Sequence, residues 1–231
     1  MKNQLLLVLL GALVLGCDPG GDPAGDASAG GPEILPVSKG DIWRYRVEST
    51  LVRPSGGEET RIVERVRKYL GEVRKDAEGQ AIEAFEIVEE GVPIEQELVR
   101  ILPDRILACG SLSLASPNLK PIIFANPVPF VRRGLKGGED LPEIRFGEKG
   151  GAEVVRKIRV IGPEEVEVKA GRFDTIKLLF TGQDGPLGIR RTVWFAEGTG
   201  IVREEKERFT EAGGVLTHES HELVAMERSG E

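Results

Sequence analysis

Alternation of apolar and polar side chains is the feature that most limits how this chain can fold. In residues 43–51, Trp43, Tyr45, Val47 and Leu51 alternate with charged or hydroxyl-bearing residues. Successive side chains of a β-strand point to opposite faces of the sheet, so this pattern predicts a strand with one buried face. Comparable segments occur at residues 85–88, 154–161, 173–181, 188–195, 201–209 and 215–226.

Turn-forming residues separate these segments. Short segments that each contain glycine, some of them with Pro, Asp or Ser, occur at residues 54–57, 78–79, 183–186, 197–198 and 213–214, and no long helical stretch lies between them. Residues 60–70 also fit the apolar stripe of a helix, but their Val, Ile, Thr and Tyr content favours a strand. We therefore predict an all-β, mainly antiparallel fold. It is a single curved sheet or a half-open barrel, in one domain over residues 34–228.

Residues 114–135 interrupt the pattern. Prolines at positions 117, 121, 127 and 129 stand among large apolar side chains, including Ile123, Phe124 and Phe130. Because proline removes a backbone donor and fixes its φ angle, the composition predicts an irregular, Pro-rich loop. We favour a structural plug over the open sheet edge. The alternative is a lid or docking patch, in which these three residues contact a ligand or a partner.

The N-terminal segment has the composition of an export signal. Lys2 precedes an eleven-residue apolar run over residues 5–15, whereas a membrane-spanning helix needs about 20 residues. Residues 1–16 therefore predict a signal peptide. Val14-Leu15-Gly16-Cys17 resembles the lipobox of bacterial lipoproteins, although Leu15 is larger than the residue usual at that position. The resemblance implies cleavage before Cys17, a diacylglycerol on its sulfur and a fatty acid such as palmitate on the new amine.

The segment after Cys17 predicts a flexible tether. Residues 17–33 consist mainly of Gly, Pro, Asp, Ala and Ser, with no large apolar side chain to bury. The lipobox resemblance places the protein in the bacterial cell envelope, on the extracytoplasmic side and anchored by lipid. Asp18 resembles the signal that keeps some lipoproteins in the inner membrane. It favours that membrane weakly, and the choice between inner and outer membrane stays open.

Three further patterns carry a family resemblance. They are G-D-I-W-R-Y at residues 40–45, A-G-R-F-D-T-I-K at residues 170–177 and W-F-A-E-G-T-G-I-V at residues 194–202. With the lipobox, they resemble a group of secreted or lipidated bacterial β proteins whose fold is similar to that of the lipoprotein-carrier (LolA/LolB-like) superfamily. The resemblance implies a curved antiparallel sheet around an apolar cavity. We expect Trp43, Tyr45 and Trp194 to fill its concave face, with ligand contact as the alternative.

No catalytic, metal-binding or cofactor-binding residue is predicted. The only two histidines, His218 and His221, have the spacing H-E-x-H instead of H-E-x-x-H. On a strand they would point to opposite faces, so we interpret them as surface residues. Cys109 has no cysteine partner once Cys17 is acylated, and we expect it to be a small buried apolar residue. The charges at residues 203–208 predict cross-strand pairs on a solvent-exposed face.

Together these features predict a non-enzymatic, membrane-anchored lipoprotein that binds an apolar or lipid-like ligand or an envelope protein. The net charge of −7 disfavours nucleic-acid binding, which requires clustered cations. A second interpretation is a structural or assembly lipoprotein without a ligand cavity. A third is a hydrolase that uses two carboxylates, but sequence alone cannot locate such a pair because its separation in space defines it.

Overall fold

The computed structural model describes residues 32–53, 56–115, 121–146, 154–184 and 186–230. The predicted signal peptide, Cys17 and all but the last two residues of the predicted tether lie outside these ranges, so the lipid anchor remains a prediction. Within the described residues, no helix is long and apolar enough to cross a membrane.

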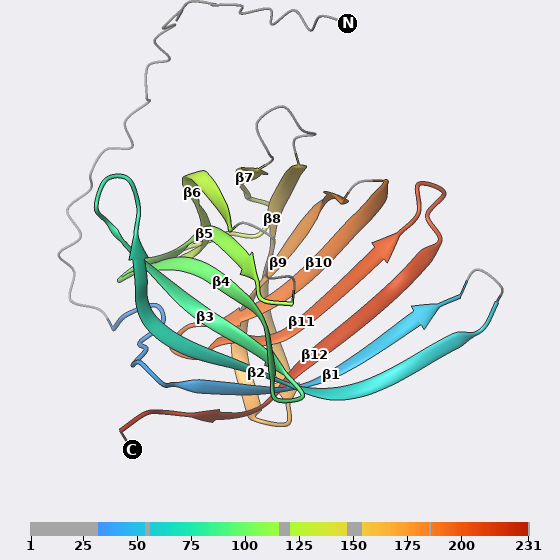
Figure 1. Cartoon of the computed structure of the whole chain (residues 1–231), viewed down its shortest axis with the longest axis horizontal. Coiled ribbons are helices and arrows are strands. Elements are labelled where there is room, and N and C mark those ends of the chain that lie inside the picture. Colours follow the sequence, from blue (N-terminus) through green and yellow to red (C-terminus); the bar gives the residue numbers. More distant parts are fainter. Residues whose placement is uncertain (1–31, 54–55, 116–120, 147–153, 185, 231) are drawn as a thin grey trace, which may run out of the picture. The chain divides into compact units, whose positions relative to one another are not determined.

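The described residues form twelve strands of one antiparallel sheet (Figure 1). The strands are β1 (Ile42–Val52), β2 (Glu58–Lys75), β3 (Ala81–Glu89), β4 (Val92–Leu102), β5 (Arg105–Ser113), β6 (Ile122–Arg132), β7 (Asp140–Phe146), β8 (Val154–Val168), β9 (Gly171–Asp184), β10 (Leu187–Ala196), β11 (Gly200–Phe209) and β12 (Val215–Glu227).

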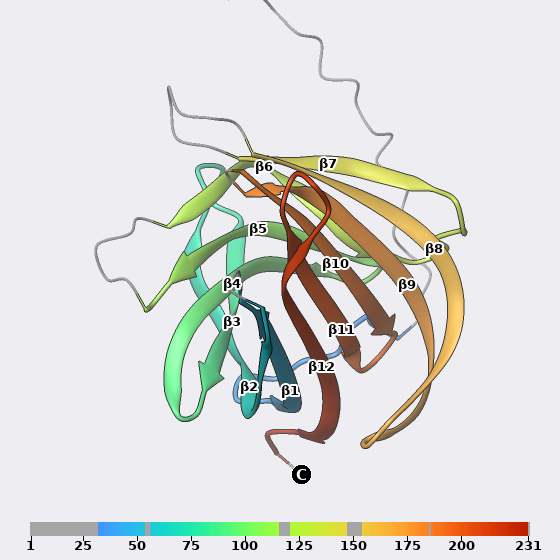
Figure 2. The ribbon, with the colours of Figure 1, turned by 90° about the vertical axis from the view of Figure 1, so that its right-hand side faces the viewer.

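The order of the strands makes the sheet an open barrel. Each strand pairs with the next one in sequence from β1 to β6 and from β7 to β12, and β1 pairs with β12. The two edges are therefore β6 and β7. The sheet curls until these edges contact each other, without a described hydrogen-bonded ladder between them (Figure 2). This confirms the predicted all-β fold of a curved, half-open barrel.

The strand predictions are confirmed where the alternation is regular. The ambiguous residues 60–70 lie within β2, where Val63 pairs with Val47 of β1.

The turns depend on glycine at specific points. Gly171 at the start of β9 has a φ of 138°, and Gly198 between β10 and β11 has a φ of 75°, conformations that other residues rarely adopt.

The expected irregular loop over residues 114–135 requires a correction. Residues 116–120 lie outside the described ranges, but Ile122–Arg132 forms β6 and includes Pro127 and Pro129. A proline cannot donate to a ladder, so within sheets it occurs at edge strands, at strand starts or at bulges, and β6 is an edge strand. The pairing of β6 with β5 also shifts register between Ala108 and Gly110.

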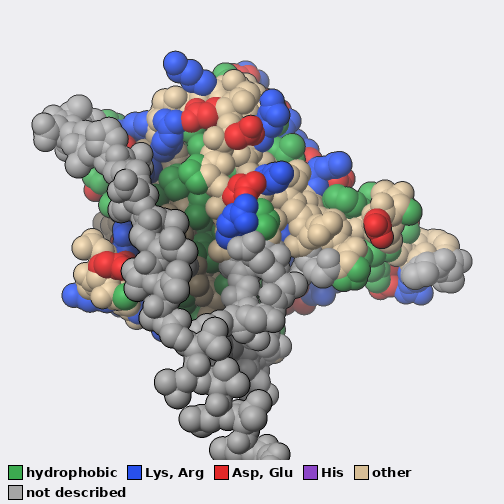
Figure 3. Space-filling view, turned by 90° about the horizontal axis from the view of Figure 1, so that it is seen from above, with side chains coloured by type: hydrophobic (Ala, Val, Ile, Leu, Met, Phe, Trp, Pro, Cys, Tyr) green, Lys and Arg blue, Asp and Glu red, His purple; other side chains and the backbone are tan. Residues whose placement is uncertain are grey.

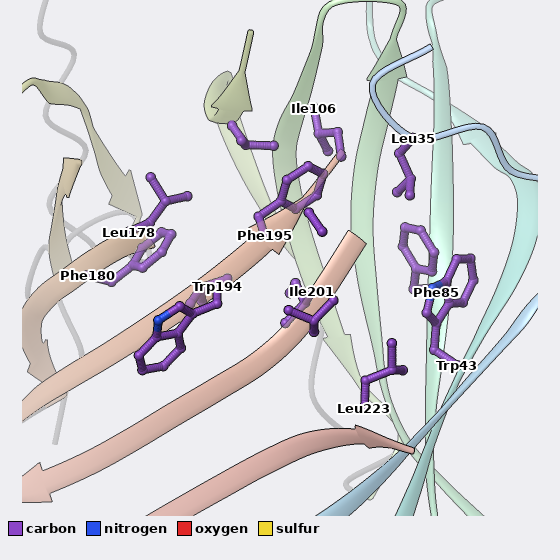
Figure 4. Close-up of a cluster of buried hydrophobic side chains, with 14 of the residues drawn as sticks. Leu35, Trp43, Phe85, Ile106, Leu178, Phe180, Trp194, Phe195, Ile201 and Leu223 are labelled. Atoms are coloured by element: carbon purple, nitrogen blue, oxygen red, sulfur yellow. The ribbon is translucent and has the colours of Figure 1, made fainter. Parts of the chain in front are cut away.

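Aromatic and aliphatic side chains fill much of the space that the sheet encloses (Figure 4). Trp43 and Phe85 pack edge to face, with 5.6 Å between ring centroids. Phe130 of β6 stacks on Phe180 of β9 at 5.5 Å. The backbone NH of Ile34 donates to the carbonyl of Pro103, and the NH of Gly198 donates to the carbonyl of Ile34. These bonds join the start of the described chain to both halves of the barrel.

Candidate ligand-binding interior

A cavity of about 230 Å³ lies inside the barrel. Most of its wall is apolar, and both halves of the sheet and the segment before β1 contribute to it. Six of the apolar lining residues are Leu35, Phe85, Ile106, Phe130, Phe180 and Phe195. The order of the strands brings these residues together, because curling of the sheet places β3 and β5 opposite β9 and β10 (Figure 2).

One part of the same wall is charged. Arg67, Glu95, Glu97, Arg156 and Arg191 line the cavity together with the apolar side chains. A second cavity, of about 50 Å³, shares Arg67, Glu95 and Glu97 with the first. The interior therefore offers an apolar compartment beside a polar one, an arrangement suited to a molecule with two chemically different ends.

Close ion pairs hold most of these charges. Arg67 Nη2 lies 2.7 Å from Glu97 Oε2. Arg191 binds Glu204 with two bonds, from Nε to Oε1 at 2.8 Å and from Nη2 to Oε2 at 3.1 Å. Lys206 Nζ lies 2.9 Å from Glu204 Oε1. Burial raises the pKa of Glu204, but Arg191 and Lys206 outweigh it and hold that pKa well below its usual range.

The position of Glu204 corrects the interpretation of residues 203–208. These residues do form cross-strand pairs, but Glu204 is only 5% exposed and lines the smaller interior cavity. Charged side chains occupy both faces of β11, because Arg203 lies on the opposite face and pairs with Glu205 at 2.7 Å. The prediction of a solvent-exposed face is therefore wrong for Glu204, which faces the interior, and it holds for Arg203 and Glu205 on the opposite face.

His221 also belongs to the interior. It is 5% exposed, and its Nε2 lies 3.0 Å from Glu219 Oε2 and 3.2 Å from Arg65 Nη1. Burial lowers the pKa of His221. The prediction that both histidines are surface residues is therefore wrong for His221, since β12 directs it inward beside Val47 of β1. His218 has a half-exposed side chain on the opposite face of β12, as the spacing predicted.

Glu95 differs from the other interior carboxylates. It lines both cavities, yet its carboxyl makes no hydrogen bond or ion pair within the described residues. Burial raises its pKa and nearby Glu97 raises it further, against the opposing effects of Lys206, Arg191 and Arg65. The pKa of Glu97 is lowered instead, because Arg67 and Arg191 outweigh the effect of its burial.

Four of the six predicted contact residues lie in or next to this interior. Phe124 and Phe130 line the larger cavity, and Tyr45 lines the smaller one. The Tyr45 hydroxyl donates to the carbonyl of Ile201 at 2.8 Å. Trp43 is buried against Phe85, and its Nε1 donates to the carbonyl of Thr199 at 2.7 Å. Trp43 is therefore a core residue that does not line the cavity itself but packs against Phe85, which does.

Trp194 and Ile123 lie elsewhere. Trp194 lies between the cations of Lys177, at 4.7 Å, and Arg203, at 5.0 Å. Figure 4 shows Trp194 and Phe195 on opposite sides of β10. The expectation that Trp194 fills the concave face is wrong because alternation along β10 directs Val193 and Phe195 inward and Trp194 to the other face (Figure 4). Ile123 is 44% exposed and lines an outer groove beside buried Cys109.

The charged interior is the part of the site that sequence reasoning missed. One signal was available in β2, where Arg65 and Arg67 share a period-two face with buried Val63 and Tyr69. Charges also cover the outside, where a space-filling view shows Lys, Arg, Asp and Glu side chains interspersed around hydrophobic ones (Figure 3). Composition alone therefore does not distinguish an inward charge from an outward one.

Comparisons with known proteins establish the fold and leave the chemistry open. A candidate exported protein of Bacteroides fragilis with a YmcC-like fold superposes with a TM-score of 0.51 and 13% identity, over 85% of this chain and all of that one. The likeness is one of fold. A candidate lipoprotein of Parabacteroides distasonis gives a TM-score of 0.46 and 10% identity, over 85% of this chain and 99% of that one. No family model matches the chain.

One curated protein has a partial sequence match. The methylthioribose-1-phosphate isomerase of Pelotomaculum thermopropionicum is 29% identical over 136 residues, which cover 48% of this chain and 36% of the isomerase. The chain thus matches little more than a third of that enzyme, and the match assigns no activity. The described residues contain no group of three or more His, Cys, Asp or Glu side chains that could hold a metal ion.

Proposed function

We propose that this protein is a non-catalytic lipoprotein whose barrel holds the apolar part of an amphipathic small molecule. The observation that carries the proposal is the 230 Å³ cavity with its apolar wall and charged end. Such cavities, mostly apolar with a few convergent polar groups, are the usual form of small-molecule sites. The lipobox-like sequence at Cys17 and the resemblance to lipidated bacterial β proteins support a location on the extracytoplasmic side of a membrane.

The cavity favours this function over an assembly role without a ligand. Its volume equals about seven or eight groups of the size of a water molecule, at ~30 Å³ each. A short alkyl chain of about eight carbons therefore suits it as a probe. A larger natural ligand would extend from the cavity or require the contacting edges β6 and β7 to separate.

Filling the cavity tests the proposal. Ala108 lines it, so Ala108→Phe should block binding of 1-octanol, measured by calorimetric titration of the full chain with Cys17→Ser to prevent lipidation. Ala212→Phe introduces the same ring at an exposed turn and should bind like the parent protein. Urea unfolding of each variant verifies that the barrel is intact. If octanol fails to bind the parent protein, or binds Ala108→Phe equally well, the cavity is not the ligand site.

A carboxylate hydrolase is the second candidate, supported by one observation. Glu95 and Glu97 lie on the same cavity wall, and their pKa values shift in opposite directions, as in many acid–base pairs. The ion pair of Glu97 with Arg67 disfavours a nucleophilic role, because it stabilises the carboxylate. Turnover of a panel of nitrophenyl glycosides and esters by the parent protein, lost in both Glu95→Gln and Glu97→Gln, would replace the binding proposal with this one.

A further inference from the structure

Each cation of the interior already makes a close contact with a carboxylate or a carbonyl. Arg67 pairs with Glu97, Arg191 and Lys206 pair with Glu204, and Arg65 pairs with Glu219 and with Glu89. Arg156 donates to the backbone carbonyl of Gln183. An anionic ligand group would therefore have to displace a carboxylate or a carbonyl from a formed contact.

Among the described residues that line the two cavities, one completely buried cation atom lacks a hydrogen-bond partner, and a ligand cannot reach it. Nε of Arg67 has no hydrogen-bond partner, but it is completely buried, with the guanidinium 3.8 Å from the centre of the Phe85 ring. A ligand acceptor could not reach this atom without moving Phe85 or Arg67. The buried Nε therefore does not make the cavity a site for an anion.

Glu95 presents the opposite situation. Its carboxyl is the one lining either cavity that lacks an ion pair or hydrogen bond within the described residues, and its oxygens are not among the completely buried unpartnered atoms. Ser111, on the neighbouring strand β5, lines the same cavity and carries a hydroxyl that can accept a hydrogen bond. These groups form an acceptor site beside an apolar compartment.

We propose that the charged end of the cavity recognises a cationic amine on the head of the amphipathic ligand, through an ion pair with Glu95. This inference rests on the proposed ligand-binding function and adds the chemical class of the ligand. An ammonium group supplies the direct ion-pair partner that Glu95 lacks within the described residues, and the apolar wall contacts the attached alkyl chain. Removal of a buried charge from water is unfavourable unless the charge is paired, so the ligand completes the interior network.

Three probes with one alkyl tail test the head group separately from the tail. The full chain with Cys17→Ser is titrated at pH 7 with 1-octylamine, 1-octanol and octanoate below their micelle concentrations. We expect octylamine to bind about tenfold more tightly than octanol, a difference of ~1.4 kcal/mol, and octanoate to bind most weakly. Octanol binding without a preference for octylamine would overturn the amine inference alone. Failure of all three probes would overturn the cavity function.

Variants at position 95 identify the residue responsible. Glu95→Gln should lower octylamine affinity about tenfold and leave octanol affinity within twofold, and Glu95→Lys should reverse the preference toward octanoate. Glu205→Gln is the matched control, because it removes a carboxylate from the outer face of β11 and should leave all three affinities unchanged. Urea unfolding checks that each variant folds. Equal octylamine affinity of Glu95→Gln and the parent protein would contradict the ion pair.

Discussion

Asp41 and Arg228, which lie 187 residues apart in sequence, form a partly buried ion pair that joins the start of β1 to the C-terminal end of β12. Arg228 Nη1 lies 2.9 Å from Asp41 Oδ2, and Asp41 is 1% exposed. Asp41 also accepts hydrogen bonds from the backbone NH groups of Ser38 and Ser229. Although burial raises the pKa of Asp41, these bonds and Arg228 outweigh it and lower the pKa. The pair therefore links the ends of the described chain at the β1–β12 ladder.

Replacement of Asp41 should destabilise the barrel strongly. Asp41→Ala leaves two backbone NH groups without their acceptor and removes the carboxylate partner of Arg228, which keeps the carbonyls of Pro36 and Gly198, so we expect a loss of about 3 kcal/mol in the free energy of unfolding. Urea denaturation followed by tryptophan fluorescence measures this loss. Asp174→Ala, at an exposed position of β9, should change stability by no more than ~0.5 kcal/mol. Equal effects of the two substitutions would contradict a structural role for the pair.

The Arg191–Glu204 pair should show strong coupling. Glu204→Leu leaves the charges of Arg191 and Lys206 without their buried partner and should cost about 3–5 kcal/mol. Adding Arg191→Met removes one of these unpaired cations, so the double variant should be more stable than Glu204→Leu alone. Urea denaturation of the single and double variants gives the coupling energy. A double variant whose loss is the sum of the single losses would show that the two charges act independently.

Phe130 should control the length of the ligand tail. It stacks on Phe180 at the cavity wall, so Phe130→Ala should enlarge the cavity and cost about 3 kcal/mol of stability. We expect the variant to prefer a decyl over an octyl tail, measured by competition between 1-decanol and 1-octanol. Phe209→Ala removes a ring that contacts Arg190 and lines no described cavity. Phe209→Ala should keep the tail-length preference of the parent protein. If both variants shifted equally toward the decyl tail, the cavity at Phe130 would not determine the tail length.

Acid should destabilise the barrel in two steps. Burial lowers the pKa of His221 in the folded protein below its unfolded value of about 6.5. As the pH drops below about 6.5, the unfolded chain therefore binds a proton at this histidine more readily than the folded protein does, and the free energy of unfolding falls. The hydrogen bond with His221 is the main cause that lowers the pKa of Glu219 to about 2. Glu219 therefore contributes stability above its unfolded pKa of 4.5, which is lost as the pH falls toward 2.

Unfolding experiments between pH 8 and pH 3 can separate the two steps. Urea denaturation should show a decline in stability that begins below pH 7. His221→Gln should abolish the part between pH 7 and pH 5, because glutamine does not titrate in this range. His218→Gln, on the outer face, is the control and should keep the parent profile. A pH dependence in His221→Gln that equals the parent's would exclude His221 as its source.

Cys109 should react only after unfolding. It is buried, and burial raises the pKa of its thiol to about 11, so the reactive thiolate is scarce at neutral pH. We expect the native chain with Cys17→Ser to react with a disulfide reagent at least a hundredfold more slowly than in 8 M urea. Rapid labelling of the native protein would show that the groove beside Cys109 opens in solution.

The sequence predicted the local structure well. The strands of β1 and β9 to β12 follow from alternating residues such as Trp43, Tyr45 and Val47, because a period of two is a property of the strand itself. The sequence was less informative for β6. Its prolines indicate an irregular segment unless the strand is known to lie at an edge, and edge position depends on the order of all the strands.

The interior site depended on tertiary structure. In β11 the charges of Arg203 and Glu205 alternate with those of Glu204 and Lys206, so both faces look equally polar in the sequence. Curling of the sheet turns Glu204 inward, toward partners on other strands, and leaves Arg203 on the outer face beside Trp194. Alternation by itself determined that this chain forms two-faced strands. Closure of the sheet decided which face became the cavity wall, because contacts between distant strands fix the inside of a barrel.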